Sequence, residues 1–495
     1  MRVQLFVPPG GYVAERWAKG SSMPPLGILS IAAVLEKEGI EVDVVPADVL
    51  GLGGPDIERE IKRAEADIIG VTCSTENRFQ SFELIRRARR VRPQALTVLG
   101  GPHASLAAED SLAHIPELDV VVRGEGELTT VDLCRSLTAG RDKAAWTGIP
   151  GLSFRNDGRI TTNPPRPLIQ DLDSLPFPAF HRVPFERYNF TIDVPGRGPL
   201  PAINIMTSRG CPFACNFCAT PVNWGRRVRL RSPKNVCDEI EGHIARYGSR
   251  VIFFYDDTFN VSSRRVEDMC AEILRRKLDV FWRAEVRLDL MTKPLLARMK
   301  EAGLFHLSFG IEAGSERVRN EIINKKIDIR DFHNLVRWCR ELEVVPAVFF
   351  IFSHPTETWA EARETIDLIE RYRGEIEGTV SILHIYPGTP LERTAKETGR
   401  LPRDYSWAKK RFSKVITLPL AQGDVPLFVD KLTWSQVSEL VFRWSFTAGG
   451  KSIWRKAPKV FKHIHSWGDI RRYAVMAWIY VRLKLRKFRS SPKNR

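Results

Sequence analysis

Short apolar segments alternate with amphipathic segments of helical period over about the first 140 residues. The strand-like runs are VQLFVP, EVDVVPAD, DIIGVTCS, LTVLGG and DVVVRGEGE, and helix-like runs such as LGILSIAAVLEKEG and PDIEREIKRAEA separate them. This alternation predicts a parallel, doubly wound α/β domain of Rossmann-like type. Ligands of such sheets bind at the carboxyl ends of the strands.

The pattern changes between residues 150 and 200 and then resumes. GLSFRNDGRI predicts a small hairpin, and the proline-rich NPPRPLIQDLDSLPFPAF predicts an extended connector. From about 200 to 400, six strand-like runs follow, which are INIMTS, VIFFYDD, FWRAEV, LFHLSFGIEA, VPAVFFIF and VSILHIYPG. Six βα units are two short of a closed eight-stranded barrel, so we expect a partial, open (β/α)6 barrel of TIM type.

These patterns divide the chain into four regions. We expect a Rossmann-like domain at 1–145, a hairpin and proline-rich linker at 146–198, the partial barrel at 199–400, and a basic, mainly helical region at 401–495. Catalytic groups should lie at the carboxyl ends of the barrel strands.

The composition is that of a soluble globular protein, with 43% hydrophobic and 27% charged residues. Met1 leads directly into a strand-like run without a secretory signal, so we expect a cytoplasmic protein with reduced thiols. Eight cysteines in that compartment bind metal or fill the core rather than form disulfides. Five of them lie singly in apolar or helical settings and are predicted to be core residues, namely Cys73, Cys134, Cys237, Cys270 and Cys339.

The net charge of +16 comes almost entirely from the end of the chain. Residues 451–495 contain 14 Lys and Arg but only one acid, Asp469. Within 470–488 only nine uncharged residues follow one another, far fewer than the about 20 that span a bilayer. This segment could form an interfacial helix with peripheral membrane contact, a helix packed on the barrel mouth, or an RNA-binding patch. Of these three, we do not expect nucleic-acid binding.

One motif carries specific chemistry. TSRGCPFACNFCA places Cys211, Cys215 and Cys218 with C-x3-C-x2-C spacing directly after the first barrel strand. Three thiolates on one loop can hold three irons of a [4Fe-4S] cubane and leave the fourth iron open to a small chelating ligand. A zinc site is the alternative, but it needs a fourth ligand, and the next cysteine, Cys237, follows 19 residues later in a predicted helix.

The stretch from 203 to 390 resembles the core of the radical S-adenosylmethionine superfamily, whose C-x3-C-x-aromatic-C signature is intact with Phe217 as the aromatic residue. The resemblance implies that the open iron chelates S-adenosylmethionine, and that reductive cleavage yields methionine and a 5'-deoxyadenosyl radical. It also implies an external one-electron reductant of the flavodoxin or ferredoxin type. Phe217 would then lie against the adenine.

Further segments match this family in order. FYDDTF resembles the segment that binds the methionine amino group of the cosubstrate. FGIEAGSE resembles the segment near the ribose or the methionine carboxylate. WRAEVRLD ends the third barrel strand and should face the same barrel mouth. The implied contact residues are Asp256, Asp257, Glu285, Arg287, Gly310, Glu312 and Ser315. One of the two aspartates can instead cap the next helix, and Glu285 and Arg287 can instead form a mutual surface pair.

The loop after the fifth barrel strand departs from the family pattern. Where many relatives carry a glycine-rich GFPGET-like turn, this chain has FSHPTET with His354. His354 is a candidate proton donor or substrate contact, and the alternative is an ordinary turn residue.

The N-terminal region resembles the cobalamin-binding domain that is fused to one large radical S-adenosylmethionine subclass. The matching segments are PPGG, PPLGILSIAAVLE, GVTCST, GGPH and VVRGEGE, and glycines in them let the backbone approach a bulky ligand. The implied cobalamin contacts are Pro9, Gly10, Thr72, Ser74, Gly100, Gly101, Pro102, Gly124 and Glu125. A nicotinamide cofactor is disfavoured because no G-x-G-x-x-G follows the first strand.

The corrinoid signature D-x-H-x-x-G is absent, and His103 in GGPH does not stand in that context. We therefore expect base-off cobalamin without a protein imidazole ligand, its nucleotide tail passing Thr72, Ser74, Gly100 and Gly101. A degenerate domain that binds no corrinoid is the alternative.

The resemblance implies an enzyme that methylates an unactivated carbon of a small-molecule or lipid-like substrate through methylcobalamin and a 5'-deoxyadenosyl radical. The two domains should then face each other across one cavity near residues 190–225. The same cofactors could instead drive oxidative cyclisation or rearrangement. A transfer-RNA methylthiotransferase would need three N-terminal cysteines for a second cluster, and a non-catalytic corrinoid carrier or sensor would not cleave the cosubstrate.

Overall fold

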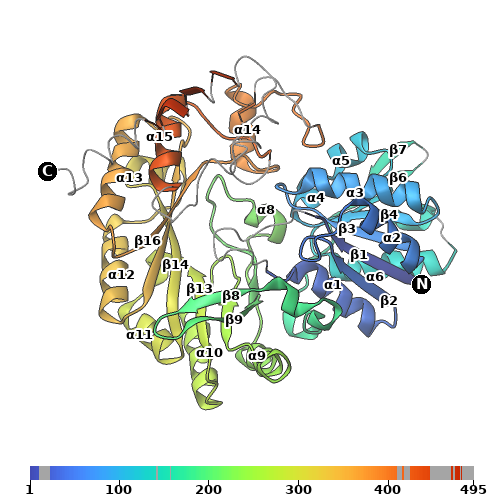
Figure 1. The fold of residues 1–495 in the computed structure, drawn as a ribbon, viewed down its shortest axis with the longest axis horizontal. Helices are drawn as coiled ribbons and strands as arrows, with labels where there is room; N and C mark the ends of the chain where they lie inside the picture. The colour runs from blue at the N-terminus through green and yellow to red at the C-terminus, as the bar shows by residue number, and fades with distance from the viewer. Residues whose placement is uncertain are drawn as a thin grey trace.

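The computed structural model describes residues 1–9, 23–140, 143–156, 158–409, 415–416 and 424–445, with single residues between 470 and 481. Most of the basic segment 470–488 therefore lies outside the described residues, as does Gly10. In Figure 1 the N-terminal domain, in blue, lies beside an open curved sheet drawn from green to orange.

The first sheet has the doubly wound topology that the alternation predicts. Its parallel strands are β1 (Arg2–Val7), β2 (Glu41–Pro46), β3 (Ile68–Thr72), β4 (Leu96–Gly100) and β5 (Val120–Val122), in the spatial order β2-β1-β3-β4-β5. The helices are α1 (Leu26–Lys37), α2 (Gly54–Ala64), α3 (Arg78–Val91), α4 (Pro102–Leu106), α5 (Ala108–His114) and α6 (Gly126–Thr138). Val3, Leu5 and Val7 enter one hydrophobic core and Phe6 enters the other, because successive strand residues face opposite sides of a sheet covered on both faces.

The predicted hairpin is present as β6 (Leu152–Asn156) and β7 (Arg159–Thr162), after the short helix α7 (Lys143–Trp146). It pairs antiparallel with β5 and so extends the first sheet, an addition that the sequence pattern did not indicate. The proline-rich connector that follows contains only short 3-10 turns, at Leu172–Ser174, Phe180–Arg182 and Phe185–Tyr188. The connector is fixed to α1 by the Ala179 amide, which donates to the Leu29 carbonyl over 3.0 Å.

The second sheet contains the six parallel strands of a partial barrel. They are β9 (Gly198–Ile205), β12 (Val251–Phe254), β13 (Phe281–Val286), β14 (Leu304–Glu312), β15 (Val345–Phe352) and β16 (Glu377–Ile382), paired in chain order. The additional strand β8 (Thr191–Val194) pairs antiparallel with β9, so β8 and β16 form the two edges and the barrel is open. The expected open (β/α)6 architecture is confirmed.

Helices cover the outer face of this curved sheet. They are α9 (Pro233–Tyr247), α10 (Ser263–Arg275), α11 (Lys293–Glu301), α12 (Ile329–Glu341) and α13 (Trp359–Arg371), whereas α14 (Pro390–Glu397) lies at the mouth of the barrel, where the Leu391 amide donates to the Asn216 carbonyl. All six helices begin at a side chain that accepts a hydrogen bond from the first helical turn, which satisfies an otherwise unpaired amide. These N-cap residues are Ser232, Ser262, Thr292, Asp328, Thr358 and Thr389.

The region after the barrel returns to the N-terminal domain. Arg78, only 1% exposed, donates to the carbonyls of Trp407 and Asp424, each over 2.9 Å, and to that of Thr75 over 2.6 Å. Helix α15 (Trp434–Ser445) packs beside β16. None of the helices within the described parts of the chain combines the length and hydropathy needed to cross a bilayer.

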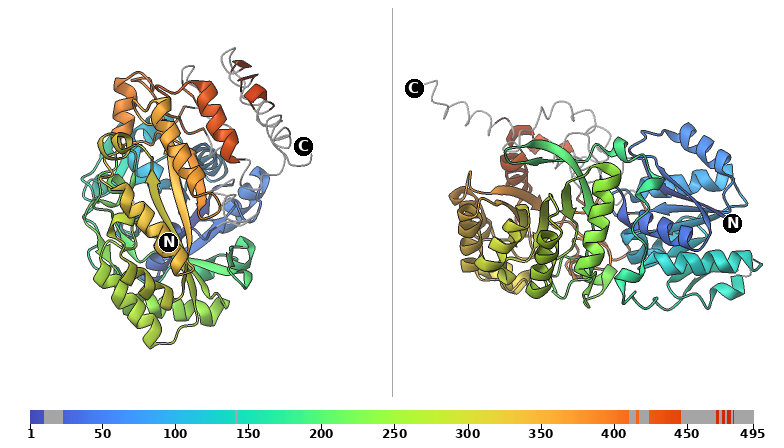
Figure 2. Two further views of the ribbon diagram at one scale, coloured as in Figure 1. Left: turned by 90° about the vertical axis from the view of Figure 1, so that its left-hand side faces the viewer. Right: turned by 90° about the horizontal axis from the view of Figure 1, so that it is seen from below.

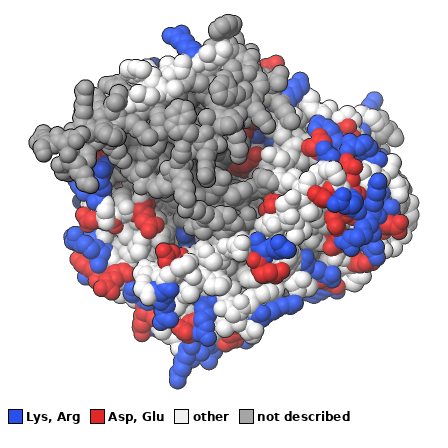
Figure 3. Space-filling view, viewed as in Figure 1, with Lys and Arg blue, Asp and Glu red and all other residues white. Residues whose placement is uncertain are grey.

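Seen from below, the N-terminal domain again lies beside the barrel (Figure 2, right). On the face shown in Figure 3, basic and acidic side chains are intermingled over the described surface rather than gathered by sign. This distribution agrees with a basic excess that resides at the end of the sequence.

Candidate active site

The three motif cysteines lie on a loop between two short strands. β10 (Ser208–Arg209) and β11 (Arg229–Leu230) form an antiparallel ribbon, and the loop between them carries the cysteines and the short helix α8 (Thr220–Trp224). The motif cysteines are partly exposed, whereas the other five are buried in the hydrophobic cores, as predicted. Three soft thiol donors with access to solvent are suited to an iron-sulfur cluster.

Backbone hydrogen bonds attach this loop to the mouth of the barrel. The Asn216 amide donates to the Ile323 carbonyl over 3.1 Å, and the Asn216 carbonyl accepts from the Leu391 amide over 3.1 Å. Burial raises the pKa of the Cys218 thiol to about 11 and also raises that of Cys215. Coordination by a metal favours the ionised form of such thiols.

The zinc alternative lacks a fourth donor. Cys237 is fully buried in α9 and belongs to the core of the barrel. Within the described ranges, no three His, Cys, Asp or Glu side chains converge as ligands of a single ion. A cubane distributes its thiolates over three different irons and does not require such convergence.

The two aspartates after β12 point to different partners. Asp256 is 2% exposed and accepts from the amide and the hydroxyl of Thr207, each over 3.0 Å, and from the Ser208 hydroxyl. Asp257 instead accepts from Thr220 at the end of the cysteine loop, over 2.8 Å. Burial raises the pKa of Asp257 to about 6, and the Thr220 hydrogen bond opposes the shift. Asp256 thus supports the backbone before the loop, and Asp257 faces the loop.

Glu285 lies at the end of β13. Burial raises its pKa to about 7, and Arg283 on the same strand opposes this shift while Asp257 and Asp256 add to it. The Arg287 guanidinium does not pair with Glu285 but lies 3.7 Å from the centre of the Phe213 ring in the cysteine loop and forms an ion pair with Asp289. The mutual surface pair considered for Glu285 and Arg287 is therefore not formed.

Glu312 ends β14 in a left-handed backbone conformation, with φ of 66°. One carboxylate oxygen accepts from Lys325 over 2.6 Å, and the other is buried without a hydrogen-bond partner among the described residues. A Cβ at Gly310 would lie 2.0 Å from Glu312 Oε1, so a side chain there would displace this pair from its present position. An unsatisfied buried carboxylate oxygen fits a ligand that brings a hydroxyl or ammonium donor.

The remaining candidate residues near the cysteine motif already contact neighbouring protein groups. Phe217 packs beside Cys215 against a small apolar cluster, and its ring centre lies 6.4 Å from that of His354. Burial lowers the pKa of His354 to about 3, so the ring is neutral, and its Nε2 lies 3.1 Å from the Ile351 carbonyl. The Ser315 hydroxyl lies 3.5 Å from Glu361 of α13.

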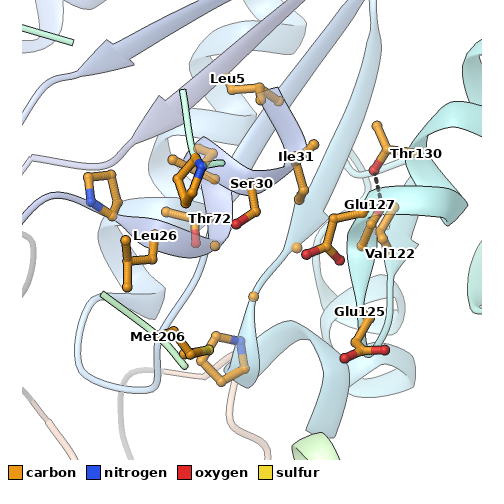
Figure 4. Close-up of a pocket in the computed structure, with 18 of the residues that line it drawn as sticks. Leu5, Leu26, Ser30, Ile31, Thr72, Val122, Glu125, Glu127, Thr130 and Met206 are labelled. Carbon is orange, nitrogen blue, oxygen red and sulfur yellow. Dashed lines mark hydrogen bonds between the residues drawn. The ribbon is translucent and has the colours of Figure 1, made fainter. Parts of the chain in front are cut away.

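A cavity of about 500 Å³ lies between the first sheet and the barrel. Its walls include seven of the nine residues expected to contact a corrinoid, which are Thr72, Ser74, Gly100, Gly101, Pro102, Gly124 and Glu125. Pro9 is not among the lining residues. The barrel contributes Asn204, Met206 and Tyr255 to the opposite wall. Figure 4 shows Thr72 and Leu26 on the N-terminal side and Met206 facing them across the space.

Glycines make room in this cavity. A Cβ added at Gly27 would meet no protein atom within 4 Å, and one at Gly100 would meet only the Val122 carbonyl oxygen, at 4.0 Å. At both positions a methyl group would enter the open space. Gly101 has another reason to be glycine, because its φ of 97° and a Cβ 2.8 Å from the Cys73 carbonyl exclude other residues.

The polar groups of the cavity also suit a large amide-bearing ligand. The side-chain oxygens of Asn204 and Asn223 line it and are buried without a hydrogen-bond partner in the described structure. No histidine belongs to the described lining. His103 is buried outside the lining, where its Nδ1 lies 3.1 Å from Thr75 Oγ1. The residues present fit a corrinoid held without a protein imidazole.

The N-terminal domain has no site for a second iron-sulfur cluster. Cys73 and Cys134 belong to different hydrophobic cores on the two faces of the first sheet. These are the only two cysteines in that domain, so the residues needed by a transfer-RNA methylthiotransferase are missing.

Three features of the site escaped the sequence interpretation. Lys325 reaches Glu312 from a turn that no motif marks, and Leu172, Leu175 and Phe177 of the connector line the cavity. The apolar residues clustered in LDSLPFP could have indicated that this segment contacts a ligand or another part of the chain. Arg209 and Arg229 beside the cysteines form buried ion pairs with Glu125 of the other domain.

Two family models match the chain. The B12 binding domain matches residues 19–134, and the radical SAM superfamily matches residues 205–369. The first range contains β2 to β5 of the first sheet, and the second contains the cysteine loop and β12 to β15 of the open barrel.

The relatives include an uncharacterized methyltransferase of Pyrococcus horikoshii, 32% identical over 79% of this chain and 82% of that protein. The anaerobic magnesium-protoporphyrin IX monomethyl ester cyclase of Rubrivivax gelatinosus is 28% identical over 85% of this chain and 74% of that protein.

Among solved structures, the radical S-adenosylmethionine methyltransferase TsrM of Kitasatospora setae, with cobalamin and a [4Fe-4S] cluster bound, has the same fold. The TM-score is 0.71 at 18% identity, with 97% of this chain and 99% of that chain covered.

Proposed function

Because the chain belongs to the cobalamin-dependent radical S-adenosylmethionine family, we propose that it methylates an unactivated carbon of a small-molecule or lipid-like substrate. The observation that carries this proposal is the shared cavity, whose one wall is the glycine-containing edge of the first sheet and whose other wall is the barrel. A substrate between these walls would be within reach of both cofactors.

In this proposal Cys211, Cys215 and Cys218 hold a [4Fe-4S] cluster. A bound cluster supplies the electron for cleavage of S-adenosylmethionine, and a bound corrinoid supplies a transferable methyl group. The protein holds both groups in fixed positions and excludes water from the space between them.

The barrel mouth would bind the methionine and ribose parts of the cosubstrate. Asp257 faces the cysteine loop and, once ionised, provides a negative charge for the amino group. The free oxygen of Glu312 accepts a hydrogen bond, and Lys325 fixes the orientation of that carboxylate. Phe217 provides an apolar face for the adenine, and Glu285, Gly310 and Ser315 remain predicted contacts.

The first domain would hold the corrinoid by shape. Gly27 and Gly100 leave space along the wall, and Asn204 and Asn223 offer acceptors for amide donors. The family likeness of this wall supports the nucleotide-tail path past Thr72, Ser74, Gly100 and Gly101.

The names of the two relatives point to two outcomes, a methylated product and an oxidative ring closure. Counting the products of S-adenosylmethionine separates them. Methylation consumes S-adenosylmethionine in two ways, giving S-adenosylhomocysteine and 5'-deoxyadenosine, whereas ring closure without methyl transfer gives only 5'-deoxyadenosine.

The test is anaerobic reconstitution with iron, sulfide and hydroxocobalamin, followed by quantification of both groups. We expect about four irons per chain. After reduction with titanium(III) citrate and addition of S-adenosylmethionine, we expect a burst of about one S-adenosylhomocysteine per corrinoid, because no acceptor is present for a second turnover.

Formation of 5'-deoxyadenosine without this burst would overturn methyl transfer and support the cyclase type of outcome. Formation of neither product by fully loaded protein would support a corrinoid carrier or sensor instead.

A further inference from the structure

Four charged side chains form a buried network between the two domains. Glu125 and Glu127 lie at the start of α6 in the N-terminal domain, and Arg209 and Arg229 lie on the ribbon that carries the cysteine loop. Arg209 donates to Glu125 over 3.0 Å and to Glu127 over 2.6 Å, and Arg229 donates to Glu125 over 2.6 Å. No side chain of the four is more than 9% exposed.

The same residues attach the connector. The second oxygen of Glu125 accepts from the Ile169 amide over 2.7 Å, and Arg229 donates to the Ile169 carbonyl over 2.9 Å. Arg229 also donates to the Trp224 carbonyl over 3.2 Å, and the Arg209 guanidinium lies 5.3 Å from the Trp224 ring centre. One network therefore joins the first domain, the connector and both flanks of the cysteine loop.

Stability alone does not explain such a network. Removing four charges from water is costly, and buried ion pairs of good geometry often add little to the free energy of unfolding. Their directional hydrogen bonds do fix a unique arrangement of the parts that they join.

The location of the network indicates what its fixed arrangement is for. Arg209 stands two residues before Cys211 and directly opposite Arg229 in the ribbon register. Glu125 and Glu127 line the cavity, as does Arg209 (Figure 4 shows both glutamates). The network is thus a direct contact between the base of the cysteine loop and the cavity wall.

We propose that Glu125, Glu127, Arg209 and Arg229 are positioning residues that set the distance and orientation of the cluster relative to the corrinoid. The inference rests on the proposed function, since it requires both groups to be bound. These residues act through the ribbon and the start of α6. Their role is to place the two reactive centres so that cosubstrate cleavage is coupled to methyl transfer.

The test uses the fully reconstituted protein and two neutral variants, Glu127→Gln and Arg209→Met. The readout is the magnetic interaction between the reduced cluster and cobalt(II), measured by electron paramagnetic resonance, because its strength depends on their separation. We expect both variants to bind iron and corrinoid but to show a weakened or broadened interaction.

The Arg231 and Glu239 pair provides a matched control. It is an equally buried ion pair, 2.5 Å long, and Arg231 also belongs to the cavity wall, but the Glu239 carboxylate lies on α9 outside the lining. Glu239→Gln should lower the melting temperature without altering the magnetic interaction. The conservative variant Arg209→Lys keeps a positive charge between Glu125 and Glu127 and should therefore retain more of the interaction than Arg209→Met.

Unchanged magnetic interaction in correctly loaded Glu127→Gln and Arg209→Met would overturn the proposal and leave a purely structural network. If Arg209→Met fails to fold, Glu127→Gln and Arg209→Lys decide the question. Wild-type protein that binds no corrinoid would overturn the proposed function as well, so the two failures are distinguishable.

Discussion

The N-terminal wall of the cavity and the mouth of the barrel are built in opposite ways. The N-terminal wall consists of strand ends and helix starts, and Gly27 and Gly100 make room in it by leaving side chains out. The barrel mouth gathers ionisable side chains, among them Asp257 and Glu285, whose pKa values are raised chiefly by desolvation. The first region selects by shape and the second by charge.

This difference predicts different sensitivities. Adding a methyl group should disturb the N-terminal cavity wall and leave the barrel mouth largely intact, whereas removing a charge should do the reverse. The following variants test this contrast, beginning with the largest effect.

Cys215→Ala should abolish the cluster, because the remaining two thiolates cannot hold a cubane. We expect loss of the absorbance near about 400 nm that arises from thiolate-to-iron charge transfer. Corrinoid binding should persist, because the cavity wall is unchanged. Cys339→Ala, in a buried helical position of α12, is the control and should keep its iron. Retained iron and absorbance in Cys215→Ala would contradict the ligand assignment.

The adjacent glycines separate fold from binding. Gly101→Ala should lower the free energy of unfolding by about 3 kcal/mol, because its backbone conformation excludes a side chain. Gly100→Ala should unfold like wild type in denaturant but bind hydroxocobalamin about 10-fold more weakly or worse, because the added methyl group enters the cavity. Equal corrinoid affinity in Gly100→Ala and wild type would place the ligand elsewhere.

The raised pKa of Glu285 predicts that the stability of the protein without cofactors depends on pH. The pKa of its carboxyl is raised from 4.5 to about 7, so the folded state binds more protons than the unfolded state between these values. The free energy of unfolding should therefore fall as the pH rises through this window, by at most about 3 kcal/mol. Glu285→Gln should flatten this part of the curve, measured by denaturant unfolding at several pH values. Parallel curves for the variant and wild type would show that Glu285 is not a source of the slope.

A charge far from the mouth should matter least. Lys234 on α9 pairs with Asp238 over 2.7 Å, but its side chain is 78% exposed. Lys234→Ala should change the free energy of unfolding by less than about 0.5 kcal/mol and leave both cofactors bound. A larger change in the free energy of unfolding or in cofactor binding would show that charges outside the barrel mouth matter as much as those within it.

Much of this fold could be predicted because the relevant signals are local. Alternating apolar runs and helical periods placed the strands of both sheets, and the spacing of three cysteines on one loop indicated a cluster. Glycines at strand ends indicated Gly100 and Gly101, whose neighbours in sequence are also their neighbours in the cavity wall.

The rest depends on register and on distant pairing. Asp256 and Asp257 are consecutive, and which of them faces the loop depends on how β12 lies in the sheet. Arg209 and Glu125 are 84 residues apart, and no periodic pattern connects them. The attachment of the hairpin to β5 and the contact of Lys325 with Glu312 likewise arise from tertiary packing.

Arg78 connects the beginning of the chain to a segment more than 300 residues later, through the carbonyls of Trp407 and Asp424. During synthesis the N-terminal domain emerges first and can form its sheet long before those carbonyls exist. The region around α3 therefore acquires its last bonds only after the barrel has been made. Glu76 and Asn77, directly before α3, line the cavity, so this part of its wall is fixed in place only when the end of the chain is present.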